Sequence, residues 1–236
     1  MTNANEIVAQ LQLLGSEGYK KTLLRHGIKE PCFGVKIEEL KKIQKVVKKD
    51  YRLALDLYSS GVYDAMYLAG LIADDMKMSK EDLQTWAEGA TCPMLSENTV
   101  AWVASESLFG REKALEWIDS KSEMIACAGW ATLSSLASIK RDEDLDFDEC
   151  KALLNRVENS IHQSPNRVRS NMNGFVIAVG CYIEALADFA LQVATRIGKV
   201  SVDVGDTACK VSYAPDSIQK VRDRGTIGKK RKTAKC

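Results

Sequence analysis

Apolar residues recur along most of the chain at a spacing of about 3.6 residues, the period of an α-helix. Residues 36–48 carry the clearest example, because lysines surround a stripe of apolar positions there: Ile37, Leu40, Ile43, Val46 and Val47. The prolines fall between such segments, at Pro31, Pro93, Pro165 and Pro215. Since a proline ends or kinks a helix, this placement agrees with the periodicity, and the pattern predicts a succession of helices.

Helices are predicted over residues 5–14, 36–48, 51–58, 62–73, 79–90, 96–109, 111–119, 122–139, 147–161, 166–184, 185–197 and near 215–224. Residues 199–211 alternate instead, which predicts a short extended segment. Because the joints are short, neighbouring helices should pair, and units of about 35–45 residues fit HEAT-like repeats. We predict an all-α fold: a HEAT-like helical-repeat solenoid over residues 1–198, an extended segment plus a short terminal helix over 199–224, and a basic flexible tail over 225–236.

Charge is divided unevenly along the chain. The formal net charge is +1, but residues 210–236 hold nine Lys or Arg side chains against Asp216 and Asp223, a net of +7. Residues 1–209 then carry 24 basic and 30 acidic side chains, a net of −6. A cationic tail on an acidic body can contact the phosphates of a nucleic acid or fold back onto the body, and the sequence leaves both open.

The composition, 45% hydrophobic and 28% charged, is that of a globular protein. Seven scattered cysteines without a C-x-x-C pair, together with only two histidines, predict reduced and mostly buried thiols, so we expect neither a metal nor another cofactor. The first residues lack the cationic start and apolar run of a signal peptide. We therefore expect a cytoplasmic protein that does not enter a membrane.

The most specific signal lies in residues 33–75, which begin with a Phe-Gly-Val triplet leading into a helix and continue with a helix pair. This segment resembles the amino-terminal part of the DNA alkylation repair glycosylase family, and weaker helical similarity continues to about residue 198. The resemblance implies a C-shaped solenoid whose concave face holds duplex DNA, and it implies removal of cationic alkylated purines. The matching positions are Phe33, Gly34, Val35, Leu40, Ile43, Lys45, Asp64, Ala65, Leu68 and Ala69.

Removal of such a base requires a carboxylate near the sugar and aromatic faces that attract positive charge. The resemblance implies that a Trp-Asp-x-x-Asp motif in the central repeat and an arginine in the next repeat supply these groups. Residues 91–107 contain no Trp-Asp pair, but Trp102 and Glu106 share one helical face and are the catalytic candidates, as aromatic contact and charge-stabilising carboxylate. Gly129 and Trp130 stand where active members carry paired arginines. The alternative is that Trp102 packs in the core and Glu106 is a solvated helix residue.

Candidate nucleic-acid contacts fall in three basic segments. The arginines among them directly follow Pro165 at a predicted helix start, where backbone N–H groups and guanidinium groups can together hold a phosphate. Alternatively, the lysines form a solvated helix face and the arginines are structural. The expected partner is double-stranded DNA, alkylated or not. The candidates are Lys41, Lys45 and Lys48 in the helix 36–48, Arg167 and Arg169 after Pro165, and Lys229, Lys230, Arg231 and Lys232 in the tail.

A second interpretation is a non-catalytic helical-repeat scaffold whose concave face binds a protein or peptide. The charge of the concave inner face separates the two interpretations, because a contiguous cationic groove there favours DNA and an acidic or apolar groove favours a protein partner. The first interpretation is a DNA-binding member of the alkylation repair family, for which the missing motif leaves base excision open.

Overall fold

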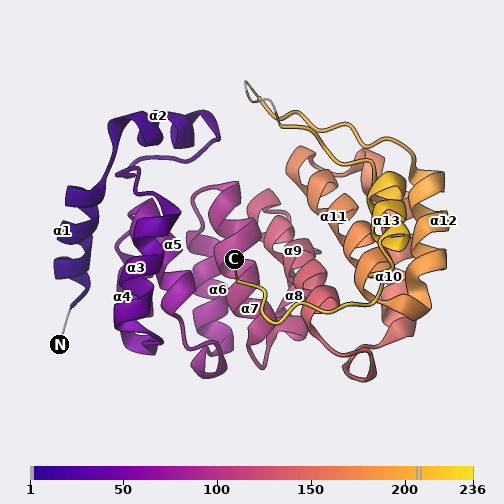
Figure 1. Ribbon diagram of the computed structural model, residues 1–236, viewed down its shortest axis with the longest axis horizontal. Helices are drawn as coiled ribbons and strands as arrows, with labels where there is room; N and C mark the ends of the chain where they lie inside the picture. The colour runs from indigo at the N-terminus through magenta and orange to yellow at the C-terminus, as the bar shows by residue number, and fades with distance from the viewer. Residues whose placement is uncertain (1–2, 206, 208, 236) are drawn as a thin grey trace.

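The computed structural model describes residues 3–205, 207 and 209–235, and every regular element in this part of the chain is helical (Figure 1). The prediction of an all-α fold is thus confirmed. The helices are α1 (Ala4–Leu14), α2 (Glu17–Arg25), α3 (Ile37–Val47), α4 (Tyr51–Ser59), α5 (Tyr63–Ile72), α6 (Lys80–Gly89), α7 (Ala101–Glu106), α8 (Gly110–Trp117), α9 (Glu123–Ile139), α10 (Phe147–Ser160), α11 (Asn166–Tyr182), α12 (Ala187–Ile197) and α13 (Ala214–Asp223).

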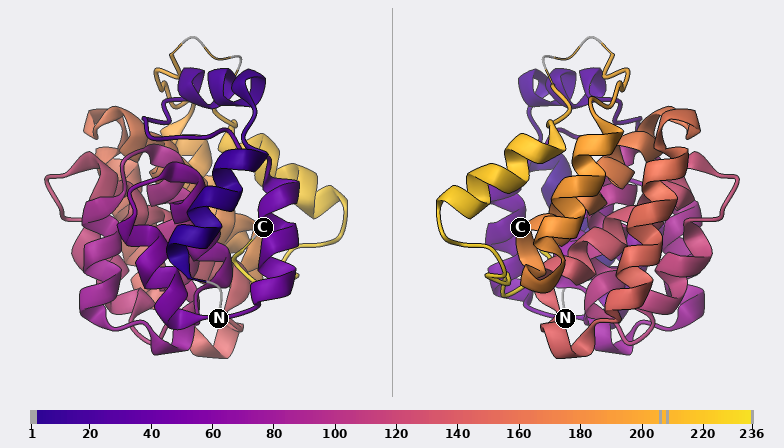
Figure 2. Two further views of the ribbon diagram at one scale, coloured as in Figure 1. Left: turned by 90° about the vertical axis from the view of Figure 1, so that its left-hand side faces the viewer. Right: turned by 90° about the vertical axis from the view of Figure 1, so that its right-hand side faces the viewer.

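The helices stack in two layers, as expected of HEAT-like repeats. In one layer α3 packs on α5, α7 on α9, α9 on α11 and α11 on α13. In the second layer α4, α6 and α8 follow one another and α10 packs on α12, and the ion pair between Arg111 and Glu149 joins α8 to α10. Contacts between the layers, such as α4 with α5 and α8 with α9, close each unit. Figure 1 shows the stack from the side, and Figure 2 shows it from its two ends.

Buried apolar side chains form two clusters, one in the N-terminal half of the stack and one in the C-terminal half. In the first, the rings of Tyr58 and Trp86 stack with centroids 4.1 Å apart. In the second, Trp130 and Phe175 join α9 to α11 with ring centroids 5.5 Å apart. Fully burying such rings is among the largest contributions to the stability of a core, so these pairs hold successive helices in register.

The Phe-Gly-Val triplet before α3 has a structural role. The carboxylate of Asp64, buried on α5, accepts hydrogen bonds from the backbone N–H groups of Phe33 at 2.6 Å and Val35 at 2.8 Å. Gly34 has φ 76°, and a β-carbon there would lie 2.6 Å from the backbone of Lys20, so only glycine fits. The signature residues therefore fix how the chain enters α3, and this placement carries no catalytic group.

Two local features differ from the prediction. Helix α2 was not predicted, because Leu23 is its only buried residue and its apolar stripe is correspondingly weak. The predicted helix 96–109 is instead a π-helical turn (Leu95–Val100) followed by α7, which ends at Glu106.

Among the described residues no single helix has the length and hydropathy to cross a membrane; α11 and the segment containing α12 pass that test only together and meet at a 115° bend.

Candidate nucleic-acid interface

A cluster of polar side chains joins the N-terminal ends of the π turn, α9 and α11. The guanidinium of Arg167, on α11, binds the Glu97 carboxylate in a bidentate manner: Nη2 donates to Oε2 at 2.7 Å and Nε donates to Oε1 at 3.0 Å. Asn171 donates to the same carboxylate at 3.0 Å. The backbone N–H of Arg167 donates to Glu123 at 2.7 Å. The cluster thus links the π turn, α9 and α11 through charge-assisted hydrogen bonds.

The Arg167 guanidinium is committed to this cluster. Its side chain is 31% exposed and that of Glu97 only 17%. Burial alone would lower the pKa of Arg167, but the charge and hydrogen bonds of Glu97 outweigh burial and raise the pKa. The side chain predicted to grip a phosphate is therefore already neutralised by a carboxylate.

Arg169, the second arginine predicted at this end of α11, points to different partners. Its Nη2 donates to Asn166 at 3.2 Å, and its buried Nε has no hydrogen-bond partner within the described residues. Asn166 in turn binds the backbone N–H and C=O of Asp203. The polar start of α11 thus anchors the segment between α12 and α13 as well as the Glu97 cluster.

The structure places the catalytic candidates Trp102 and Glu106 on α7, where Trp102 is buried and Glu106 is half-buried. Trp102 is 7% exposed and packs edge-to-face against Tyr67, with ring centroids 5.6 Å apart. Glu106 accepts hydrogen bonds from the Thr233 hydroxyl and from the backbone N–H of Ala234, the latter at 2.7 Å. Trp102 presents little ring surface to a ligand, and the Glu106 carboxylate holds Thr233 and Ala234.

At Gly129 the structure has no room for an arginine of the kind that the resemblance implied at this position. A β-carbon at this position would lie 2.8 Å from the backbone N of Ile118 and 2.9 Å from the carbonyl O of Ala114. Helices α8 and α9 approach too closely for a longer side chain. Trp130, the next residue, is 1% exposed and belongs to the C-terminal core. Gly129 and Trp130 therefore both serve the packing of α9 against its neighbours.

Residues 225–235 do not form the flexible tail expected from the sequence. This segment, called here the C-terminal strap, runs from α13 back along the ends of α9 and α7 (Figures 1 and 2). Gly228 N–H donates to Cys181 O at 3.0 Å and Arg231 N–H to Ser138 O at 2.8 Å. Lys230 pairs with Asp142 at 2.9 Å. The strap is held because its backbone and side-chain donors meet acceptors at the ends of the helices.

The end of the strap is seated in the N-terminal half of the molecule. Lys235 Nζ lies 2.7 Å from Oδ1 of Asp75, and the two side chains are 9% and 2% exposed. Lys49 contacts the same carboxylate at 3.3 Å. Burial raises the pKa of Asp75, while the charge of Lys235 acts in the opposite direction. Ala234, 1% exposed, joins the N-terminal core cluster, so the strap connects the two cores.

The seated strap and the end of α3 together border a hollow of about 490 Å³, called here the lysine hollow. Lys45 and Lys48 are exposed, and neither has an ion pair within the part of the chain that the structure describes. Two basic segments predicted from opposite ends of the sequence therefore meet on one surface, whereas Arg167 and Arg169 lie apart from it. The hollow is lined by Gln44, Lys45, Lys48, Lys49, Leu71, Glu106, Thr233 and Lys235.

The remaining predicted cations do not line the hollow. Lys41 lies half-buried on α3 and does not border the hollow, while Lys229, Arg231 and Lys232 are exposed along the strap. Lys230 is half-buried through its bond to Asp142.

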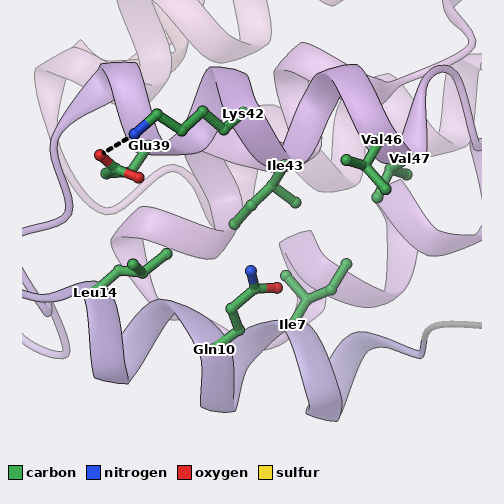
Figure 3. A pocket seen from close by; sticks show the side chains of 8 residues that line it. All are labelled: Ile7, Gln10, Leu14, Glu39, Lys42, Ile43, Val46 and Val47. Atoms are coloured by element: carbon green, nitrogen blue, oxygen red, sulfur yellow. Dashed lines mark hydrogen bonds and ion pairs between the residues drawn. The ribbon is translucent and has the colours of Figure 1, made fainter.

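The opposite edge of α3 is apolar. Between α1 and α3 lies a groove of about 260 Å³, lined by Ile7 and Leu14 of α1 and by Ile43 of α3, among others (Figure 3). Its polar rim includes the ion pair between Glu39 and Lys42, 2.7 Å long. Helix α3 therefore presents a cationic edge to the strap and an apolar edge to α1. A cationic surface favours a nucleic-acid ligand, and an apolar surface favours a protein ligand.

Comparison with known proteins agrees with this architecture. Residues 7–195 match the family model described as DNA alkylation repair enzyme. Uncharacterized proteins of Listeria innocua serovar 6a and Listeria monocytogenes serovar 1/2a are each 30% identical over 233 residues, which cover 95% of this chain and 99% of each relative. A solved structure described as a new family of proteins related to the HEAT-like repeat DNA glycosylases, with affinity for branched DNA structures, is 36% identical, covers 100% of both chains and superposes with a TM-score of 0.92.

Proposed function

Because the chain belongs to the DNA alkylation repair enzyme family, we propose that it binds DNA, branched DNA in particular, without excising alkylated bases. The preference for branches rests on the similarity, over the full length, to a structure whose protein has affinity for branched DNA. The absence of excision rests on the chemistry of the carboxylates described above.

One observation carries the proposal: the carboxylates that could serve excision are each held by groups of the protein itself. Excision of an alkylpurine requires a carboxylate that faces the sugar, where positive charge develops in the transition state. Glu97 is bound by Arg167 and Asn171, and Glu123 accepts from the backbone of Arg167. Glu106 accepts from the strap. Freeing any of them would break charge-assisted hydrogen bonds and leave a donor without its partner.

DNA binding requires much less of the site. Affinity for duplex or branched DNA comes largely from cations that displace counterions from the phosphates, with a strong dependence on salt. The exposed lysines of α3 and of the strap meet this requirement on a body that is otherwise acidic.

Methylated duplex DNA provides the test of the excision half of the proposal. We expect the purified protein to release neither 3-methyladenine nor 7-methylguanine above the buffer rate, since Glu97, Glu106 and Glu123 are each held by groups of the protein itself. The measurement is chromatography of free bases after incubation, with binding to the same DNA recorded in parallel and a Glu106→Gln variant beside the wild type.

Release by the wild-type protein that the Glu106→Gln variant loses would return Glu106 to a catalytic role and contradict the proposal. A protein that binds no DNA even at low salt would contradict the binding half. The apolar groove between α1 and α3 would then be the better-supported ligand surface, in favour of a scaffold that binds a protein or peptide.

A further inference from the structure

We infer that the lysine hollow is a binding site for the phosphodiester backbone of nucleic acid, with Lys48 as its anchor and the exposed strap lysines as its continuation. The inference rests on the proposed function for the identity of the ligand, and it names the surface on which that ligand lies. Four features of the hollow support the inference. They are the backbone conformation of Lys48, the existing partners of the acids beside the hollow, the hydrogen bonds of Gln44 and the path of the strap.

Lys48 adopts a backbone conformation that suits glycine. It is the only described residue other than glycine with positive φ, at φ 63° and ψ −142°. Gly198 ends α12 in nearly the same conformation, φ 73° and ψ −147°. A side chain at such dihedrals is strained, and strained residues that persist cluster at functional sites. The chain thus keeps a lysine where the fold itself would favour glycine, which is explained if its charge is needed.

The helix dipole does not account for Lys48. Cations in the last turn of a helix are favourable because they face the partial negative charge of the free carbonyl groups. That argument covers Lys45, which lies within α3. It applies equally well to a lysine one residue earlier or later, so it gives no reason for a lysine at the strained position itself.

The acids beside the hollow leave its lysines unpaired. Asp75 forms ion pairs with Lys235 and Lys49. Glu106 accepts hydrogen bonds from the Thr233 hydroxyl and from the strap backbone. Lys45 and Lys48 remain exposed without an ion pair in the described part of the chain. The available charge in the hollow is therefore positive.

The floor of the hollow is fixed before any ligand binds. Gln44 donates to the carbonyl of Leu71 at 3.0 Å, and the N–H of Lys48 donates to the carbonyl of Gln44 at 2.7 Å. These bonds set the end of α3 against α5 and hold the Lys48 backbone in place. A site organised in this way loses less conformational entropy on binding than one made of free side chains.

The strap extends the cationic surface. Lys229 and Lys232 are exposed and belong to the strap, whose backbone is held to α11 through Gly228 and to α9 through Arg231. An extended polyanion can then contact the hollow and the strap at once. A nucleic-acid backbone has this form, whereas a single phosphate could occupy only the hollow.

Lys48 allows a test in which stability and binding move in opposite directions. We expect Lys48→Gly to raise the Tm by about 2–4 °C, because glycine relieves the strain, while affinity for a DNA four-way junction falls about three- to tenfold. Lys48→Ala should lose the same affinity without the rise in Tm, since alanine keeps the strain. Differential scanning fluorimetry and fluorescence anisotropy provide the two readouts. Affinity unchanged in both variants would overturn the inference.

Charge reversal provides the matched comparison. The double variant Lys45→Glu/Lys48→Glu should bind the junction at least about tenfold more weakly. The negative slope of log K against log salt should become shallower by about 2. The control is Lys21→Glu/Lys29→Glu, which makes the same change in net charge at exposed positions on and after α2, and it should keep affinity within about twofold of wild type.

Equal losses of affinity in the two double variants would mean that DNA binding depends only on the net charge of the protein, and the inference would be wrong. Failure of the wild-type protein to bind any DNA contradicts the proposed function itself. Wild-type binding that the Lys45→Glu/Lys48→Glu variant retains contradicts only the assignment of the surface.

Discussion

Replacing Lys235 with methionine is expected to lower the free energy of unfolding by about 2–3 kcal/mol, because the change leaves the buried carboxylate of Asp75 without its closest cation. Removing one partner of a buried ion pair typically costs about 3–5 kcal/mol. Lys49, 3.3 Å from Asp75, remains and offsets part of that cost. Urea unfolding followed by circular dichroism measures the difference.

The pH dependence of this effect has a definite sign. Burial already raises the pKa of Asp75, and Lys235 opposes that rise. Without Lys235 the pKa of Asp75 should rise further, so the variant binds more protons folded than unfolded. The loss of unfolding free energy relative to wild type is then fully present above the raised pKa of Asp75. It shrinks as the pH falls towards the ordinary pKa of an aspartate.

Two further variants complete the comparison. Lys232→Met alters an exposed strap lysine and should change stability by less than about 0.5 kcal/mol. The double variant Asp75→Asn/Lys235→Met should recover much of the loss, because it leaves no uncompensated charge. A Lys235→Met protein as stable as wild type would mean that the strap is not seated on Asp75.

Arg167→Met is the second change with a large expected effect, a loss of about 3 kcal/mol of unfolding free energy. Among the described residues Glu97 would keep only Asn171 as a donor, in a site where its side chain is 17% exposed. If Arg167 is structural, as its bonds to Glu97 indicate, DNA affinity per folded molecule should stay within about twofold of wild type.

Arg169→Met is the matched control on the same helix. Its guanidinium has one bond to Asn166, and its buried Nε is unpaired within the described residues, so its loss should cost less than about 1 kcal/mol. An Arg167→Met protein that keeps its stability but loses about tenfold in DNA affinity would restore Arg167 as a phosphate contact. Urea unfolding and anisotropy on the same preparations distinguish the two roles.

The helices were predictable because most of them bury one apolar face, and periodicity reports that face directly. The exceptions follow the same rule. Helix α2 buries only Leu23 and gave no signal, and the π turn at Leu95–Val100 has the composition of the helix that it precedes. Local pattern cannot distinguish a π turn from an α-helix, since the two differ in hydrogen bonding rather than in residue type.

The candidate site was predictable only in part. The sequence singled out the basic segments, and the split of charge between body and tail left open that the tail folds back. It gave no sign that Lys235 would reach Asp75 or that Arg167 would reach Glu97, because the partners are 160 and 70 residues apart. Nor did it distinguish Lys48 from Lys45, since only the backbone shows that Lys48 is strained. Long-range pairing of charges depends on the fold, and a single sequence carries no periodic signal for it.

Equilibrium binding of a four-way junction and of a linear duplex with the same sequence, measured at several salt concentrations, tests the account most directly. We predict tighter binding to the junction, with an affinity for both ligands that falls steeply as salt rises. Equal affinity for the two forms would contradict the preference for branches, and an absence of binding at the lowest salt would contradict the account as a whole.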